Sequence, residues 1–200
     1  MSTVLILCRH GETDWNRQGR ILGQRDLPLN EVGRAQAVSM GERLASMGER
    51  QPSLPLSAVF ASPLCRAQAT AALAFPGHTI RLDARLLEVD CGAATGLTRA
   101  EFRALDDGRW WDAVTADPER AALPGGESFG AVRDRMVAAL TEFAAAYPEE
   151  ILAVVSHGTA LEVATAALLG RPLAEAASFS YANGTYRILS LQDGGWVVRP

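Results

Sequence analysis

The sequence predicts an α/β protein with a three-layer α/β/α arrangement, a mainly parallel sheet and a small lid or insertion around residues 92–127. Two observations predict this class. Apolar, β-branched runs alternate with segments of helical periodicity through the first 170 residues, which is typical of a parallel sheet covered by helices on both faces. The chain has 200 residues and is 48% hydrophobic, so we expect a single domain over residues 1–200.

The first part of the chain predicts two strands and two helices. Residues 4–8 form a continuous apolar run, which favours a buried strand. Residues 11–28 are polar and rich in glycine, so we expect a loop there, and Asn30 is the expected N-cap of the next helix. After a loop at "QPSLP", residues 51–55, we expect a second strand at 58–62, and the proline that follows opens another helix.

The middle of the chain predicts short extended segments and then the clearest helix. Residues 80–82 and 86–88 are expected to be extended, and residues 98–117 have weak helical character. The glycine-rich "PGGES" breaks the chain before a helix for which Ser128 is the expected N-cap. In that helix apolar residues recur at helical spacing: Phe129, Val132, Met136, Leu140, Phe143 and Tyr147.

The last part of the chain repeats the opening pattern. Residues 151–158 are an apolar run that ends in a histidine and a glycine, and a helix is expected from there to Leu169. The tail alternates apolar and polar residues on both sides of Asp193, which begins an Asp-Gly-Gly turn, so we expect an antiparallel hairpin. An exposed edge strand of that hairpin could pair with a second copy of the chain and so form a homodimer.

Composition excludes several classes of protein. The formal net charge is −4, and charged residues make up 21% without a long run of either sign, which argues against nucleic acid and anionic membranes as partners. The apolar run at residues 4–8 is too short for a signal peptide or a membrane span. The cysteines Cys8, Cys65 and Cys91 are odd in number and lack C-x-x-C spacing, so we expect reduced thiols in a cytoplasmic protein.

Polar residues gather where the predicted strands end. Arg9 and His10 follow the first strand, Arg66 lies one turn into the helix after the second, and His157 follows the late strand. In an open α/β sheet, ligands bind outside the carboxyl ends of the strands. These residues could therefore meet in one crevice, which Glu88, at the end of another extended segment, could join.

The residue types in this group suit phosphoryl transfer. Arginine binds phosphate through a planar fork and keeps its charge, and a histidine can attack phosphorus to form a covalent intermediate. A carboxylic acid can protonate the leaving alcohol and then activate water. A glycine follows each of the two histidines, and it lets the backbone turn tightly and approach a ligand.

The stretch "RHGETDWN", residues 9–16, resembles the signature of the histidine phosphatase superfamily, also called phosphoglycerate mutase-like. The resemblance continues in the family's order to about residue 158 and so covers most of the chain. Its further blocks are "DLPLNEVGRAQA", "SPLCRAQATA", "LLEVDCGAATGLT", "PGGESF" and "VVSHG".

This resemblance implies a role for each residue of the group. His10 would be the phosphorylated nucleophile, and Arg9, Arg66 and His157 would form the phosphate pocket around it. The substrate would be a small-molecule phosphate ester, with no metal and no other cofactor. Further residues complete the implied site: Asn16 and Gly158 would help to hold the phosphoryl group, and Glu88 would be the proton donor, with Asp90 as the alternative acid.

Within the superfamily the sequence favours a phosphatase over a mutase. Residues 98–127 carry single arginines and no adjacent pair, Thr159 follows the late His-Gly, and "PGGES" resembles the phosphatase branch. Two alternatives stay open: a phosphoglycerate mutase, and a regulatory module that binds a phosphate ligand without turnover. A zinc site from His10, His157 and Glu88 lacks any supporting local H-x-x-x-H or C-x-x-C pattern.

Overall fold

The structure is a computed structural model that describes residues 2–50 and 56–199, so the predicted loop "QPSLP" lies outside the described residues. One sheet contains the strands β1 (Val4–Arg9), β2 (Leu56–Ala61), β3 (Ile80–Leu82), β4 (Ile151–Ser156), β5 (Tyr186–Gln192) and β6 (Gly195–Val198). Their order is β3-β2-β4-β1-β5-β6. The pairs among β1 to β4 are parallel, whereas β5 and β6 are antiparallel neighbours. The predicted parallel sheet and C-terminal hairpin are both confirmed.

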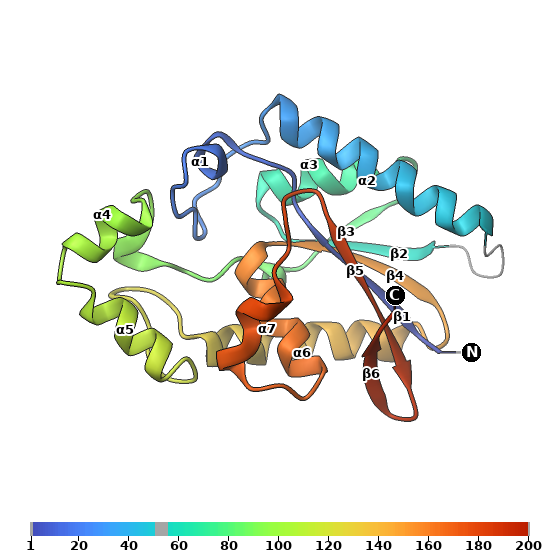
Figure 1. The fold of residues 1–200 in the computed structure, drawn as a ribbon. Coiled ribbons are helices and arrows are strands. Elements are labelled where there is room, and N and C mark those ends of the chain that lie inside the picture. Colours follow the sequence, from blue (N-terminus) through green and yellow to red (C-terminus); the bar gives the residue numbers. More distant parts are fainter. Residues whose placement is uncertain (1, 51–55, 200) are drawn as a thin grey trace.

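Helices cover both faces of the sheet. In Figure 1, α2 and α3 lie on one side of the strands, and α6 and α7 lie on the other. This confirms the three-layer α/β/α class. The α-helices are α1 (Asp14–Arg17), α2 (Glu31–Arg50), α3 (Cys65–Ala74), α4 (Arg99–Ala104), α5 (Arg109–Ala116), α6 (Phe129–Ala146) and α7 (Gly158–Leu168), and the 3₁₀ turns are η1 (Ala84–Leu86), η2 (Gly92–Ala94) and η3 (Leu173–Phe179).

Two apolar clusters hold the layers together. Because neighbouring residues of a strand point to opposite faces, Leu7 packs toward α6 and α7 whereas Cys8 packs toward α2 and α3. On the first face the rings of Phe60 and Phe143 stack with centroids 3.8 Å apart. Both faces of the central strands are therefore buried, which explains why these strands are continuous apolar runs.

The structure corrects two expectations about short segments. Leu86 is not extended, because the Asp83 side chain accepts a hydrogen bond from the Arg85 amide and caps the 3₁₀ turn η1. Leu87 has extended dihedral angles but belongs to none of the strands described. The loop at residues 11–28 contains the helical turn α1, which a reciprocal capping box between Thr13 and Asn16 stabilises.

The predicted lid is present at residues 92–127. It comprises η2, α4 and α5, and the two helices lie together at the end of the molecule opposite the N-terminus (Figure 1). Gly108 separates α4 from α5 with a φ of +83°, a left-handed conformation that glycine adopts without strain. Thr98 and Ser128 cap α4 and α6, so the expected cap at Ser128 is confirmed.

A contact between two glycines presses the loop after β1 against α2. A Cβ atom on Gly11 would lie 2.2 Å from the Gly33 carbonyl oxygen, and one on Gly33 would lie 2.1 Å from the Glu12 carbonyl oxygen. The Asn30 side chain accepts the Gly33 amide at 2.8 Å, which confirms Asn30 as the cap. Only glycine allows the two backbones to approach this closely.

This contact gives the first prediction. Gly33→Ala should lower the free energy of unfolding by about 1–3 kcal/mol, because the new methyl group overlaps backbone that cannot move away cheaply. Its neighbour Val32 is 49% exposed, so Val32→Ala should stay within about 0.5 kcal/mol of the parent. Urea denaturation of the three proteins measures this, and equal stability of both variants would contradict the close contact.

Candidate active site

The parallel register brings two histidines together at the carboxyl ends of the central strands. Arg9 at the end of β1 pairs with Ser156 at the end of β4. His10 and His157 directly follow these paired residues, so they lie side by side at the same edge of the sheet. Their ring centroids lie 5.1 Å apart with an interplanar angle of 60°. Both side chains are buried, with 2% and 0% of their surface exposed. The sequence prediction that they meet is confirmed.

Arg66, in the first turn of α3, lies between these histidines and is fully buried. Its Nε atom is 3.3 Å from His10 Nε2 and 3.3 Å from His157 Nδ1. Its terminal nitrogens donate to the carbonyl oxygens of Arg25 at 2.6 Å and Gly23 at 2.9 Å. The predicted loop at residues 11–28 thus fixes the guanidinium plane.

These contacts assign the proton on each imidazole. His10 Nδ1 lies 2.6 Å from the Gly11 carbonyl oxygen. A carbonyl can only accept, so Nδ1 carries the proton and the lone pair is on Nε2. His157 accepts from Arg66 at Nδ1, so its Nε2 carries the proton and donates to Ser62 Oγ at 2.8 Å. The neutral His10 therefore presents a nucleophilic nitrogen toward Arg66.

Burial and positive charge keep both rings neutral. Burial lowers the pKa of His10 well below its usual value, and the charges of Arg66 and Arg9 lower that pKa further. The same causes, burial first and Arg66 second, lower the pKa of His157. A neutral His10 needs no prior loss of a proton before it can attack an electrophile.

Arg9 lies against the first turn of α7. Its Nη1 donates to the Tyr181 carbonyl oxygen at 2.5 Å. A Cβ atom on Gly158 would lie 3.2 Å from Arg9 Cζ, so a glycine at this position lets the guanidinium pack on the helix. The Nε atom of Arg9 is buried and has no hydrogen-bond partner among the described residues. A buried donor of this kind is costly unless a ligand accepts from it.

Glu88 is the acid that faces these cations. Its carboxylate accepts the amides of Val89 and Ala160 at 2.9 Å and of Thr159 at 3.3 Å, so it sits at the N-terminus of α7. Burial lowers the pKa of Arg9 and of Arg66, and the charge of Glu88 opposes that lowering at both. The carboxylate of Asp90 instead accepts the Gly92 amide at 2.9 Å.

Asn16 joins the site through a residue that sequence reasoning missed. Asn16 Oδ1 accepts from the Thr13 amide at 3.1 Å, the Thr13 hydroxyl at 3.0 Å and Asn183 Nδ2 at 3.3 Å. Asn183 also donates to the carbonyl oxygens of His10 at 3.1 Å and Gly11 at 3.3 Å. It lies in the loop before β5, and its local sequence carries no signal of this role.

Two hydroxyl groups that support the site were also missed. Ser62 holds His157, and its position directly after β2 could have revealed it by the same strand-end reasoning. Thr70 accepts the Gly11 amide at 3.1 Å and donates to the Arg66 carbonyl oxygen at 2.7 Å. It lies one helical turn after Arg66, so α3 contributes to the site at both positions.

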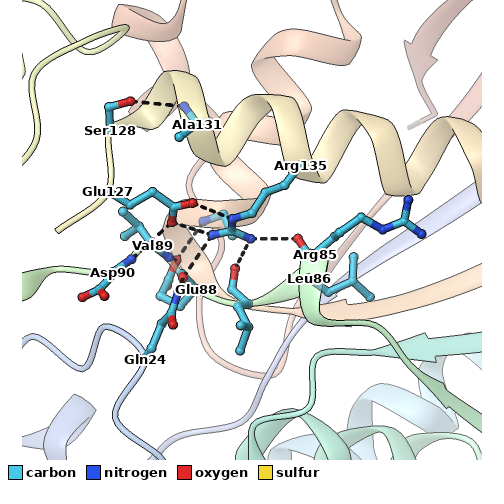
Figure 2. Close-up of polar contacts among 12 residues, drawn as sticks. Gln24, Arg85, Leu86, Glu88, Val89, Asp90, Glu127, Ser128, Ala131 and Arg135 are labelled. Carbon is cyan, nitrogen blue, oxygen red and sulfur yellow. Dashed lines mark hydrogen bonds and ion pairs between the residues drawn. The ribbon is translucent and has the colours of Figure 1, made fainter.

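Arg135 on α6 fixes the segment that carries Glu88. Figure 2 shows its guanidinium between the Glu127 carboxylate and the backbone of residues 85–88. Two donors bind the Glu127 carboxylate, at 2.8 and 2.9 Å. Three more reach the carbonyl oxygens of Arg85 and Leu87 at 2.7 Å and of Glu88 at 3.1 Å. All five N–H donors of the guanidinium are thereby used.

A cavity of about 300 Å³ opens beside residues 88–90, which we call the acid segment, between the lid and α7. Its walls are mainly apolar and come from several parts of the chain. They include Val89 and Asp90 of the acid segment, Trp111 and Val114 of α5, Thr159 and Glu162 of α7, and Leu173 and Ala176 of η3. The predicted lid therefore covers a space that adjoins the candidate site.

The described residues contain neither a cluster of metal ligands nor a membrane-spanning helix. No three histidine, cysteine, aspartate or glutamate side chains among residues 2–50 and 56–199 are grouped so that they could hold a metal ion. Within the same residues, no helix is long and apolar enough to cross a membrane.

A buried cation lies between two neutral imidazoles, with an unpartnered arginine donor and a carboxylate nearby, and chemically such a group can hold an anion beside a nucleophilic nitrogen. The chain matches the family model described as the histidine phosphatase superfamily (branch 1) over residues 5–200, and it belongs to this superfamily. The family resemblance of the sequence is thereby confirmed. Members of this superfamily that resemble the chain are named as phosphatases and as mutases.

Similar proteins span nearly the whole chain. A probable phosphoglycerate mutase, GpmB, of Salmonella paratyphi B is 31% identical over 198 residues, which cover 97% of this chain and 87% of the relative. A mycobacterial glucosyl-3-phosphoglycerate phosphatase, solved with VO3, has a TM-score of 0.84 at 34% identity and covers 98% of this chain and 96% of its own. YhfR of Bacillus stearothermophilus has a TM-score of 0.83 at 32% identity, and the match covers 98% of this chain and 95% of YhfR.

The buried neutral histidines predict acid sensitivity. In the unfolded chain histidine binds a proton near pH 6.5, whereas the lowered pKa values keep His10 and His157 neutral in the fold. As pH falls below about 6.5 the unfolded chain binds more protons, so stability should fall by up to about 1.4 kcal/mol per pH unit for each histidine. Urea denaturation between pH 5 and 7.5 measures the slope.

Matched variants identify the source of that slope. His10→Asn should reduce it, whereas His78→Asn, at an exposed histidine, should leave it unchanged. An identical slope in His10→Asn and the parent would count against the buried, neutral state of His10.

The arginine on α6 gives a separate prediction. Arg135→Met should lower the free energy of unfolding by about 2–4 kcal/mol, because it strands three backbone carbonyls and the Glu127 carboxylate. On the same helix, Arg133 is 34% exposed and its acidic partners are 48% and 72% exposed, so solvent weakens these ion pairs and Arg133→Met should cost at most about 1 kcal/mol. Thermal and urea unfolding of both variants provide the comparison, and equal costs would rule out a special role for Arg135.

Proposed function

We propose that the protein is a metal-independent phosphomonoester hydrolase that works through a phosphohistidine intermediate on His10. One observation carries the proposal: the buried Arg66 Nε lies 3.3 Å from both His10 Nε2 and His157 Nδ1. A fixed positive charge beside a neutral imidazole draws the phosphoryl group of an ester to the nucleophile and stabilises the charge of its transition state.

In the first step, His10 Nε2 attacks phosphorus and the N–P bond forms as the bond from phosphorus to the ester oxygen breaks. Nδ1–H stays on the Gly11 carbonyl oxygen and stabilises the positive ring. The leaving alkoxide takes a proton from the carboxylic acid of Glu88. The free alcohol departs, and the phosphoryl group remains on His10.

In the second step, water replaces the alcohol. The Glu88 carboxylate takes a proton from the water, whose oxygen attacks phosphorus while the N–P bond breaks. Inorganic phosphate leaves, and His10 and protonated Glu88 are restored. Glu88 fits this role better than Asp90, because Glu88 lies near enough to interact with both Arg9 and Arg66, whereas the Asp90 carboxylate accepts a hydrogen bond from the Gly92 amide.

The remaining residues of the site would bind the phosphoryl oxygens. Arg9 offers its buried, unpartnered Nε. The Nε2–H of His157 donates to Ser62, so His157 would donate to a phosphoryl oxygen from Nδ1 after taking up a proton there, which the negative charge of the ligand favours. The hydrogen bonds of the Asn16 side chain fall on Oδ1 in the described residues, which leaves its Nδ2 amide for the ligand. Gly158 contributes by admitting Arg9 to this position.

The charge of the adjoining cavity favours hydrolysis over mutase activity, which the name of the GpmB relative makes the second candidate. A mutase must hold a second phosphate or carboxylate of its substrate. Among the described residues that line the cavity, the cation is Arg99, and it is accompanied by Asp90, Glu127 and Glu162. Such a lining attracts a second anion poorly.

The thiols fit the proposed cytoplasmic setting. Cys8, Cys65 and Cys91 are all free, as expected for a protein of a reducing compartment. The substrate we propose is a small-molecule phosphate ester, with no cofactor, and the suggestion of a homodimer through the C-terminal hairpin stays a prediction.

The nucleophile gives the direct test. His10→Ala should lower the hydrolysis of p-nitrophenyl phosphate by at least about a thousandfold and should abolish acid-labile labelling of the protein by a radioactive phosphate ester. His78→Ala, at an exposed histidine, is the matched control and should behave as the parent does. Activity should survive a chelator such as EDTA. Full turnover by His10→Ala would refute the mechanism.

The same preparation separates the alternatives. Conversion of 3-phosphoglycerate to its 2-isomer in the presence of a bisphosphate primer would favour a mutase. Binding of phosphate esters without hydrolysis across a broad panel would favour a regulatory module. Hydrolysis without isomerisation is the expected result.

A further inference from the structure

Glu162 on α7 is an acid of the site region that the mechanism above does not use. It lies four residues after Gly158, so the two share one face of the helix. Gly158 packs on the Arg9 guanidinium, and Glu162 therefore points past Arg9 into the cavity that it lines. Glu162 therefore lies between the proposed phosphate pocket and the cavity under the lid.

The surroundings of Glu162 leave its charge poorly compensated. Burial and the nearby Glu88 raise the pKa of Glu162 to about 7, against the opposing effects of Arg9, the Tyr181 backbone N–H and Arg99. None of the ion pairs found among the described residues includes Glu162. A half-buried carboxylate without an ion-pair partner in direct contact gains from a ligand that donates a hydrogen bond to it.

The opposite wall does not neutralise this acid. Arg99 of α4 lines the cavity, but its guanidinium lies over the Trp111 ring, 5.5 Å from the centroid. Asp90 adds a further negative charge to the lining, whereas Glu127 is paired with Arg135. The rest of the wall is mainly apolar.

We infer that Glu162 makes this cavity select phosphate esters of neutral or cationic, partly apolar alcohols and reject leaving groups that carry a carboxylate. The inference rests on the proposed function and names the substrate class of the same site. A hydroxyl or ammonium group of the alcohol donates to the Glu162 carboxylate, and the apolar walls cover the carbon skeleton. A carboxylate in the same place meets a like charge in a poorly hydrated space, which disfavours its binding.

A matched pair of substrates tests this inference. Glycerol 3-phosphate and 3-phosphoglycerate share their phosphate and carbon chain and differ by a hydroxymethyl group in place of a carboxylate. At pH 8 the parent protein should hydrolyse glycerol 3-phosphate with a kcat/KM about tenfold higher. Glu162→Gln removes the charge but keeps the shape, and should bring the ratio of the two kcat/KM values close to one.

The pH dependence of that ratio gives a readout that needs no variant. Effects of pH on His10, Glu88 and the phosphate group are common to both substrates and cancel in the ratio. Because Glu162 ionises as pH rises through about 7, the preference of the parent should be weak at pH 5.5 and strong at pH 8. Glu162→Gln should show a flat ratio over the same range, and the exposed control Glu42→Gln should follow the parent.

The outcomes separate this inference from the proposed function. If p-nitrophenyl phosphate is hydrolysed through His10 but the parent prefers 3-phosphoglycerate, or its ratio does not change with pH, the inference is overturned and the hydrolase stands. If no ester is hydrolysed by the parent, the proposed function itself fails. Should Glu162→Gln fold poorly in a thermal unfolding assay, the pH dependence of the parent alone decides.

Discussion

The structure depends most on a single N–H group, the Nε–H of Arg66 that two imidazoles share. A fully buried guanidinium is costly unless its donors are satisfied. The terminal nitrogens of Arg66 donate to loop carbonyl oxygens, and its Nε–H donates to the two imidazole rings. The more distant charge of Glu88 offsets part of the cost of removing the guanidinium from water. Burial first, and the charge of the same cation second, lower the pKa of both histidines and keep them neutral. The chemistry of the site and the conformation of the loop at residues 11–28 therefore have one physical origin.

Sequence reasoning located the centre of the site because the centre obeys a topological rule. His10 and His157 each follow a buried strand, and neighbouring parallel strands end at the same edge of a sheet. Arg66 could be added because it lies one turn into the helix after β2. The fold class followed from the alternation of strands and helices, although the turn at Leu86 was set by a local side-chain cap that periodicity does not register.

The supporting residues could not be predicted, because their partners are remote and their types are ordinary. Asn183 contacts a carbonyl 173 positions away along the chain, from a loop without a recognisable pattern. Arg135 is an ordinary residue type for an exposed helix face, yet three of its hydrogen bonds hold the backbone of residues 85–88 and two bind the Glu127 carboxylate. Glu162 gains its properties from the depth of its site, which depends on a lid placed by the whole fold.

The place of β1 in the sheet has a consequence for how the molecule is made. This strand lies between β4 and β5, so it pairs only with strands that begin far along the chain, at Ile151 and Tyr186. Contacts of such long sequence separation form late and slow the folding of a domain. During synthesis from the N-terminus, the segment that carries His10 gains its first strand partner only with β4 and its second with β5. His10 and His157 therefore cannot meet until the residues of β4 have been synthesised.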